Sequence, residues 1–142
     1  MATLQKRLFS GILAGILLAL SAPVPAADEP VASATVKREF ASFLARFRAA
    51  LAADDAGAVA GMTQFPFMAY TDNGSDDAAG FRAKSYPRFF TTKTRRCLAR
   101  TEAIYDREPE GGENFVMFCG NLGFYFHKTQ AGFLFTEVGS ND

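Results

Sequence analysis

The first hydrophobic pattern after the N-terminal region has the spacing of a helix. Its apolar residues follow one another at steps of 4, 3, 1, 3 and 4: Val36, Phe40, Phe43, Leu44, Phe47 and Leu51. This spacing predicts one buried face of a helix of about 18 residues. Thr35 is the expected N-cap, and the other faces carry the basic side chains Lys37, Arg38, Arg46 and Arg48.

The next segment predicts a short helix and then an extended stretch. Asp54 or Asp55 can cap a helix over residues 56–62, which two glycines weaken. Residues 65–70 read as extended, and Pro66 places them at a sheet edge or at the start of a strand because proline cannot donate to a ladder.

Turn residues over 71–77 precede a third helical pattern. Residues 78–90 repeat apolar or small side chains every four positions, which predicts a helix. Pro87 must kink this helix or restart it, because its ring clashes with the preceding turn.

The remainder of the chain predicts three strands: residues 97–105, 115–128 and 133–138. A bulge is expected at Gly120 or Gly123 in the second, and residues 130–132 turn the chain into the last. Helices first and a meander afterwards indicate an α+β fold, with N-terminal helices packed on one face of a curved antiparallel sheet.

The N-terminal region has the order of a secretory signal peptide over residues 1–27. A basic head at Lys6 and Arg7 precedes an apolar run over residues 8–20, and small residues end the segment at Ala27. The apolar run is short for a membrane span. We therefore expect cleavage and a periplasmic or secreted protein, with an uncleaved anchor as the alternative.

Cleavage leaves a flexible leader over residues 28–34 and a single domain over residues 35–142. Removing Lys6 and Arg7 from the 15 basic residues leaves 13 against 15 acidic ones, so neither nucleic acid nor a membrane is an expected partner. Of the 15 Phe, 14 lie in this mature part, enough to build a core.

Cys97 and Cys119 are the two cysteines, and in an oxidising compartment they predict one disulfide. A tight hairpin at residues 111–112 would hold them too far apart, whereas a polar loop over residues 105–114 would bring them together. Two cysteines and one histidine are too few for a metal site, and no cofactor is expected.

The order of these elements resembles the nuclear transport factor 2-like superfamily. The stretches that carry the resemblance are FASFLARF from Phe40, residues 54–66, residues 81–90 with Arg95 to Cys97, and FCGNLGFYFHKTQAGFLFTEVGSND at the end. The resemblance implies a cone-shaped sheet closed by helices around an apolar pocket. Members include isomerases, dehydratases and scaffolds, so it implies a fold and leaves the function open.

Two residues are candidates for catalysis. His127 is the single histidine, and it stands beside Lys128 just before a turn, where a solvated role is favoured. The resemblance implies that a carboxylate would abstract a proton while a tyrosine holds the oxyanion. Asp72 and Glu102 are the acids near predicted strands that could serve, and both are expected to be solvated.

The aromatic excess predicts a pocket that binds an apolar or amphipathic small molecule without transforming it. We expect its lining to be Phe40, Phe43, Phe47, Phe67, Tyr70, Tyr86 and Phe118. Residues 82–107 carry eight basic residues against two acids, which favours a solvated face over an anion site. The alternatives are a partner protein in place of the small molecule, an isomerase- or dehydratase-like enzyme using His127 or Asp72 with a tyrosine, and a structural module that forms a homodimer through its sheet face.

Overall fold

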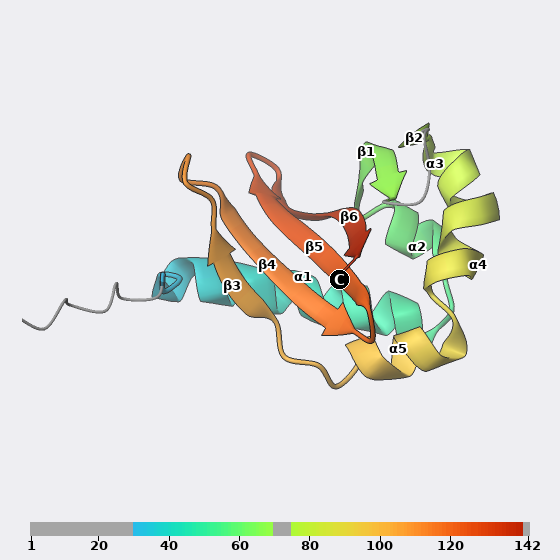
Figure 1. Ribbon diagram of the computed structural model, residues 1–142, viewed down its shortest axis with the longest axis horizontal. Helices are drawn as coiled ribbons and strands as arrows, with labels where there is room; N and C mark the ends of the chain where they lie inside the picture. Colours follow the sequence, from blue (N-terminus) through green and yellow to red (C-terminus); the bar gives the residue numbers. More distant parts are fainter. Residues whose placement is uncertain (1–29, 70–74, 141–142) are drawn as a thin grey trace, which may run out of the picture.

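A computed structural model describes residues 30–69 and 75–140 and has an α+β fold (Figure 1). Helix α1 (Ala34–Ala52) is the predicted long helix, and it begins one residue before the expected cap because Ser33 accepts the backbone N–H of Val36 at 3.2 Å. Its buried residues are Val36, Phe40, Phe43, Phe47, Ala50 and Leu51. The apolar face is therefore confirmed.

Two short elements follow α1 as expected. Helix α2 (Ala56–Ala60) is capped by Asp55, whose carboxylate accepts the N–H of Ala58 at 2.9 Å. Strand β1 (Thr63–Ala69) contains the extended segment and pairs with the two-residue strand β2 (Ser75–Asp76). The pairing of β1 with its other neighbour is interrupted between Thr63 and Met68, around Pro66, which has no N–H to contribute.

The third helical segment is continuous but changes its pitch. It consists of α3 (Ala78–Gly80), a π-helical turn η1 (Phe81–Ser85) and α4 (Tyr86–Phe89). The backbone N–H of Tyr86 donates to the carbonyl of Phe81, five residues back. A wider turn relieves the clash that Pro87 would cause in a regular helix, so the predicted disturbance at this proline is confirmed.

The prediction of a strand over residues 97–105 is wrong for most of its length. Helix α5 (Thr92–Leu98) occupies the first part, with the Thr91 side chain accepting the N–H of Thr94 at its start. Strand β3 (Ile104–Arg107) begins only after the helix has ended. The hydroxyl cap at Thr91, a common helix start, was the signal for this helix.

The segment predicted as one long strand is a hairpin. Strands β4 (Glu113–Cys119) and β5 (Leu122–Thr129) are joined by a two-residue turn at Gly120 and Asn121, and Gly120 has φ = 67°. Glycine tolerates this left-handed backbone, which a tight hairpin turn needs. The expected bulge at Gly120 or Gly123 is absent from this hairpin.

The last strand carries the irregularity instead. Strand β6 (Gly132–Ser140) pairs with β5 as Tyr125↔Glu137 and then as Phe126↔Phe135, so one extra residue of β6 lies between the two pairs. This residue is Thr136, and its hydroxyl donates to the carbonyl of Tyr125 at 3.2 Å. The bulge therefore lies at Thr136.

The strands form one sheet in the order β2-β1-β6-β5-β4-β3. Strands β3 to β6 are antiparallel, as expected, but β1 runs parallel to β6, so the sheet is mixed and the wholly antiparallel prediction is wrong. Over the described residues β2 and β3 form two open edges, and the sheet does not close. A cone with an interior pocket thus remains a prediction.

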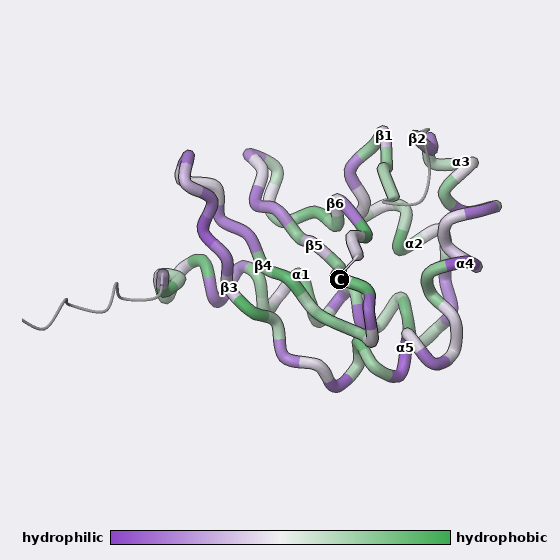
Figure 2. The backbone as a smooth tube through the Cα atoms, viewed as in Figure 1, coloured by the Kyte–Doolittle hydropathy of each residue, from purple (hydrophilic) through white to green (hydrophobic). Residues whose placement is uncertain are grey.

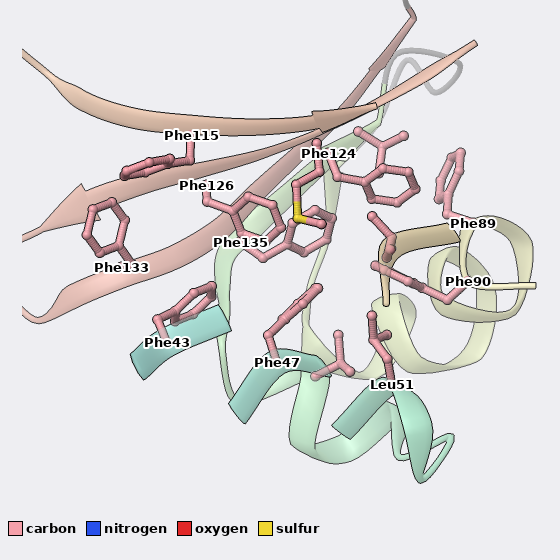
Figure 3. Close-up of a cluster of buried hydrophobic side chains, with 14 of the residues drawn as sticks. Phe43, Phe47, Leu51, Phe89, Phe90, Phe115, Phe124, Phe126, Phe133 and Phe135 are labelled. Atoms are coloured by element: carbon pink, nitrogen blue, oxygen red, sulfur yellow. The ribbon is translucent and has the colours of Figure 1, made fainter. Parts of the chain in front are cut away.

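The core lies between α1, the short helices and one face of the sheet. Figure 3 shows the rings of Phe43 and Phe47 on α1 pointing toward the strand residues Phe126 and Phe135. Phe47, Phe126 and Phe135 are all 0% exposed. Figure 2 shows hydrophilic residues gathered at the turn from β3 into β4, away from this core.

Cys97 and Cys119 form the predicted disulfide, with their Cα atoms 5.9 Å apart. The bond joins α5 to the end of β4, a route that differs from the strand-to-strand contact expected from the sequence. The turn from β3 to β4 spans the residues between Arg107 and Glu113, so the tight-hairpin register is excluded. In the portions of the chain described here, no helix is long and apolar enough to cross a membrane.

Candidate functional site

Two adjoining pockets lie where the end of α1 meets α4 and α5. The first pocket has a volume of about 270 Å³ and is lined by Arg48, Leu51, Ala52, Thr92, Arg95, Arg96 and Ala99. The second pocket is more open, at about 560 Å³, and is lined by Asp54, Arg82, Tyr86, Pro87, Phe90, Thr91, Thr92 and Arg95. Thr92 and Arg95 belong to both, so the two pockets meet along the first turns of α5.

The first pocket combines an apolar floor with a basic rim. Leu51 forms the floor of the pocket and is only 2% exposed, so its side chain also belongs to the core. Ala52 and Ala99 add further apolar surface to the lining. Arg48 forms one side of the rim. Its Nε donates to the carbonyl of Leu98 at 2.9 Å and its Nη2 to the carbonyl of Thr101 at 2.6 Å.

These bonds satisfy backbone carbonyls at the end of α5, which have no partner inside the helix. They occupy two of the five N–H groups that a guanidinium carries. Arg48 is therefore fixed in position while part of its hydrogen-bonding capacity remains open. It also joins α1 to α5, so the two walls of the first pocket are held together.

Arg95 separates the two pockets and is held from two sides. Its Nη1 lies 2.6 Å from Oδ1 of Asp54 and 3.0 Å from the carbonyl oxygen of Phe90. Asp54 has φ = 54°, a left-handed backbone that Asp tolerates better than most residues. This conformation turns the chain sharply after α1.

Tyr86 closes the inner side of the second pocket. Its hydroxyl donates to the same Oδ1 of Asp54 at 2.9 Å, and the side chain is buried. Burial, together with the hydrogen bond to Asp54 and the charge of that carboxylate, raises the pKa of Tyr86 to about 12. The phenol therefore stays protonated at neutral pH and acts as a hydrogen-bond donor.

The lining of the two pockets is strongly cationic. It carries four arginines, Arg48, Arg82, Arg95 and Arg96, against one carboxylate, Asp54. Within the described parts of the chain, only Arg95 of these four forms an ion pair. A pocket with this imbalance attracts anions.

The aromatic residues predicted to line a pocket form the core instead. Phe40, Phe43, Phe47, Phe67 and Tyr86 are each at most 5% exposed. Their rings contact other rings closely: for example, the ring centroids of Phe40 and Phe115 are 3.8 Å apart. Of these five, only Tyr86 lines either pocket. Tyr70 lies outside the described residues.

Phe118 lies on the opposite face of the sheet from these rings. Because the β4–β5 turn has two residues, Phe118 pairs with Gly123 and not with Phe124. Directly paired residues share a face, so Phe118 falls on the face away from Phe124. In a single regular strand the two would have shared a face, because they lie six positions apart.

Of the two catalytic candidates, the structure describes only His127, and it lines neither of these pockets. His127 is on the β5 face opposite Phe126, its side chain is 36% exposed, and its Nδ1 lies 4.0 Å from Oε1 of Glu108. This is a surface arrangement. Asp72 lies outside the described residues.

A third pocket of about 230 Å³ lies beside the disulfide. It is lined by Lys93, Thr94, Cys97, Cys119, Gly120, Asn121 and Leu122. Metal-binding side chains do not gather there: among the described residues, no three His, Cys, Asp or Glu side chains form a group that could hold a metal ion.

The residues of the two arginine-lined pockets were only partly visible in the sequence. The basic excess over residues 82–107 includes Arg82, Arg95 and Arg96, and Tyr86 is among the residues predicted to line a pocket. The sequence indicates Asp54 only as a helix cap, and Arg48 only as part of the basic faces of the first helix. No protein-family model matches the chain, and none of the curated proteins compared with it matches either. Its function is therefore inferred from the chemistry of the site.

Proposed function

We propose that this is an exported binding protein that holds a small amphipathic molecule in the first pocket without transforming it. The observation that carries the proposal is the combination of an apolar floor at Leu51, Ala52 and Ala99 with arginines held at its rim. Ligand pockets are mostly apolar, with a few fixed polar groups that orient the ligand. A volume of about 270 Å³ is near the lower end of the range for ligand sites, which favours a small molecule.

The state of Asp54 favours binding over catalysis. Its Oδ1 accepts hydrogen bonds from both Tyr86 and Arg95. A general base needs a carboxylate oxygen within reach of the proton that it removes, and the two hydrogen bonds to Oδ1 leave only Oδ2 of Asp54 for that role. Asp54 thus serves to hold Arg95 and Tyr86 in place, which a binding site requires.

Export rests on the N-terminal sequence and on the disulfide. The signal-peptide pattern over residues 1–27 and the Cys97–Cys119 bond both suit an oxidising compartment. We expect the intact mass of the protein from a cell-envelope fraction to match a chain that begins just after cleavage near Ala27. A species that retains Met1 would contradict export with cleavage.

Membership of the nuclear transport factor 2-like superfamily remains part of the proposal. It is supported by the order of the elements, with a long helix, short helices and then a meander of four strands. An experimental structure of the mature protein in which the sheet curls into a cone would support it further. A sheet that stays open without such a curl would contradict it.

A second candidate function is an isomerase- or dehydratase-like enzyme centred on the second pocket. The observation that favours it is the tyrosine–carboxylate pair there, with Tyr86 Oη 2.9 Å from Asp54 Oδ1. In this reading Asp54 replaces His127 and Asp72 as the acid–base group. Turnover of a carbonyl compound that is lost in Asp54→Asn but retained in His127→Ala would favour the enzyme.

Homodimer formation through the outer face of the sheet is also a proposal. Phe118 and Tyr125 lie on that face, half-buried and outside the core. Light scattering at micromolar concentration tests it. A mass of twice the chain that falls to one chain in Phe118→Glu would support the dimer, and a monomer in the unmodified protein would contradict it.

Native mass spectrometry of the protein purified from its own cell envelope tests the binding proposal. We expect a small organic molecule to accompany the folded chain and to be lost when Ala99→Trp fills the first pocket. The matched control is Ala45→Trp, which adds the same bulk at an exposed site of α1 outside both pockets. Retention of the molecule in Ala99→Trp would show that it binds elsewhere.

A further inference from the structure

We infer that the ligand of the first pocket is an organic anion, an apolar chain or ring that ends in a single carboxylate or similar group. This inference rests on the proposed function and specifies the chemical class of the molecule bound there. The apolar part would lie on Leu51, Ala52 and Ala99, and the anionic group would lie between Arg48 and Arg96.

The charge of the rim supports an anion. In the described parts of the chain, neither Arg48 nor Arg96 forms an ion pair with a carboxylate. The contacts of Arg48 are two backbone carbonyls, which leave its positive charge without a counter-ion. Charge-assisted hydrogen bonds between a guanidinium and a carboxylate are among the strongest that a protein forms.

The two arginines offer different kinds of contact. Arg48 is half-buried and fixed by its bonds to Leu98 and Thr101, so it can receive an anion without losing side-chain entropy on binding. Arg96 is exposed and forms no hydrogen bond or ion pair within the described residues, so it is free to close over the anion. One fixed and one adjustable cation suit a single small anionic group.

The neighbouring Arg95 contributes less to anion binding, because Asp54 already neutralises it. This distinction sets the expected size of the charged group. A bulky polyanion would also approach Asp54, which lines the second pocket only and would repel it. A single anionic group near Arg48 and Arg96 avoids that repulsion.

Isothermal titration calorimetry with three probes of equal chain length tests the inference. The probes are octanoate, octan-1-ol and octylammonium, which share an apolar tail and differ in the charge of the head group. We expect octanoate to bind at least about tenfold more tightly than octanol, which corresponds to the strength of one charge-assisted bond. Octylammonium should bind more weakly than octanol.

Two variants locate the anion. Arg96→Gln removes an exposed charge that forms no hydrogen bond or ion pair within the described residues, so the fold should be kept. Octanoate affinity should fall about tenfold, while octanol affinity is unchanged. Arg46→Gln removes an equal charge from an exposed position on α1 outside the pocket. Octanoate affinity in Arg46→Gln should change by less than about twofold, because the charge is screened by solvent.

The outcomes separate the two proposals. Equal binding of octanoate and octanol would overturn the anion assignment and leave the binding pocket in place. Failure of all three probes to bind the folded protein would overturn the binding proposal at this pocket, and the anion assignment with it. Equal loss of octanoate affinity in Arg46→Gln and Arg96→Gln would show a general charge effect and would also overturn the assignment.

Discussion

The aromatic core and the corner formed by α1, α4 and α5 are built from the same helices but in opposite ways. In the core, each ring fills the space beside another: the centroids of Phe47 and Phe126 lie 5.2 Å apart with planes at 86°. At the corner, the helices end or begin, and arginines and alanines leave hollows between them. An excess of large apolar side chains therefore produced a filled interior.

This contrast changes where a ligand is to be sought. Edge-to-face packing stabilises a cluster of rings, and an empty cavity within it would cost free energy. A ligand cavity is therefore not expected inside the aromatic core. The arginine side chains at the corner extend toward solvent, so they do not fill the space between the helices as the rings fill the core. The binding site is thus expected where small residues, Ala52 and Ala99, meet arginines.

Phe47→Ala tests whether the core is as full as described. Phe47 is 0% exposed and contacts the rings of Phe90, Phe126 and Phe135, so its removal should leave a cavity. We expect the free energy of unfolding to fall by about 3–5 kcal/mol in urea denaturation. A loss below about 1 kcal/mol would show that the core can collapse and is not tightly packed.

Breaking the disulfide tests the corner. Replacing both Cys97 and Cys119 by serine removes a link across 22 positions, which is worth about 3 kcal/mol in the chain-entropy model. Because α5 carries Arg95 and Arg96, octanoate affinity should also fall while the α1 core persists.

Thiol titration of the unfolded, non-reduced protein should find no free thiol, and two free thiols would contradict the bond.

Tyr86→Phe affects the corner less. The variant removes the hydroxyl that donates to Asp54 and keeps the ring stacked on Phe90, whose centroid is 5.1 Å away. We expect a loss of about 0.5–1.5 kcal/mol, the usual worth of one hydrogen bond. A loss as large as that of Phe47→Ala would mean that the hydroxyl network, and not ring packing, holds this region.

The pH dependence of stability gives the smallest effect. The pKa of Tyr86 is raised from 10.0 to about 12 in the folded protein, so folding favours the protonated phenol. The resulting stability is present below pH 10 and is lost as the pH rises toward 12. Urea denaturation from about pH 9 upward should show a steeper decline in the unmodified protein than in Tyr86→Phe.

Tyr105 serves as the internal comparison for that titration. Its hydrogen bond to Glu113 also raises its pKa, and it lies on β3, outside both arginine-lined pockets. Asp54→Asn should therefore lower the pKa of Tyr86 and leave that of Tyr105 unchanged in a tyrosinate absorbance titration. A shift of both would mean that the substitution perturbs the whole fold.

The elements with a regular spacing of apolar residues were predictable from the sequence. The apolar spacing from Val36 to Leu51 located α1, and the cysteine pair predicted the disulfide. The pairing of β4 with β5, and the sheet face on which each of their residues lies, were harder to predict because both depend on the turn between these strands. Gly120-Asn121 reverses the chain in two residues, which moved Phe118 to the other face of the sheet.

The candidate site was the least predictable feature. Arg96 is more than 40 positions from Arg48 and Asp54, and the sequence indicates only a surface or a capping position for each of the three. Only the meeting of α1 and α5, held by the bonds of Arg48 to Leu98 and Thr101, brings the arginines around one hollow. A local sequence pattern carries no information about a contact between two helices that are far apart in the chain.

Mapping the amide chemical shifts of the mature protein during titration with octanoate tests the central claim most directly. The claim predicts that the largest shifts occur at the residues of the first pocket, Ala52, Thr92, Arg96 and Ala99, and that the amides of Phe43, Phe126 and Phe135 stay in place. The largest shifts at those three phenylalanines would contradict it, because the ligand would then have entered the aromatic core.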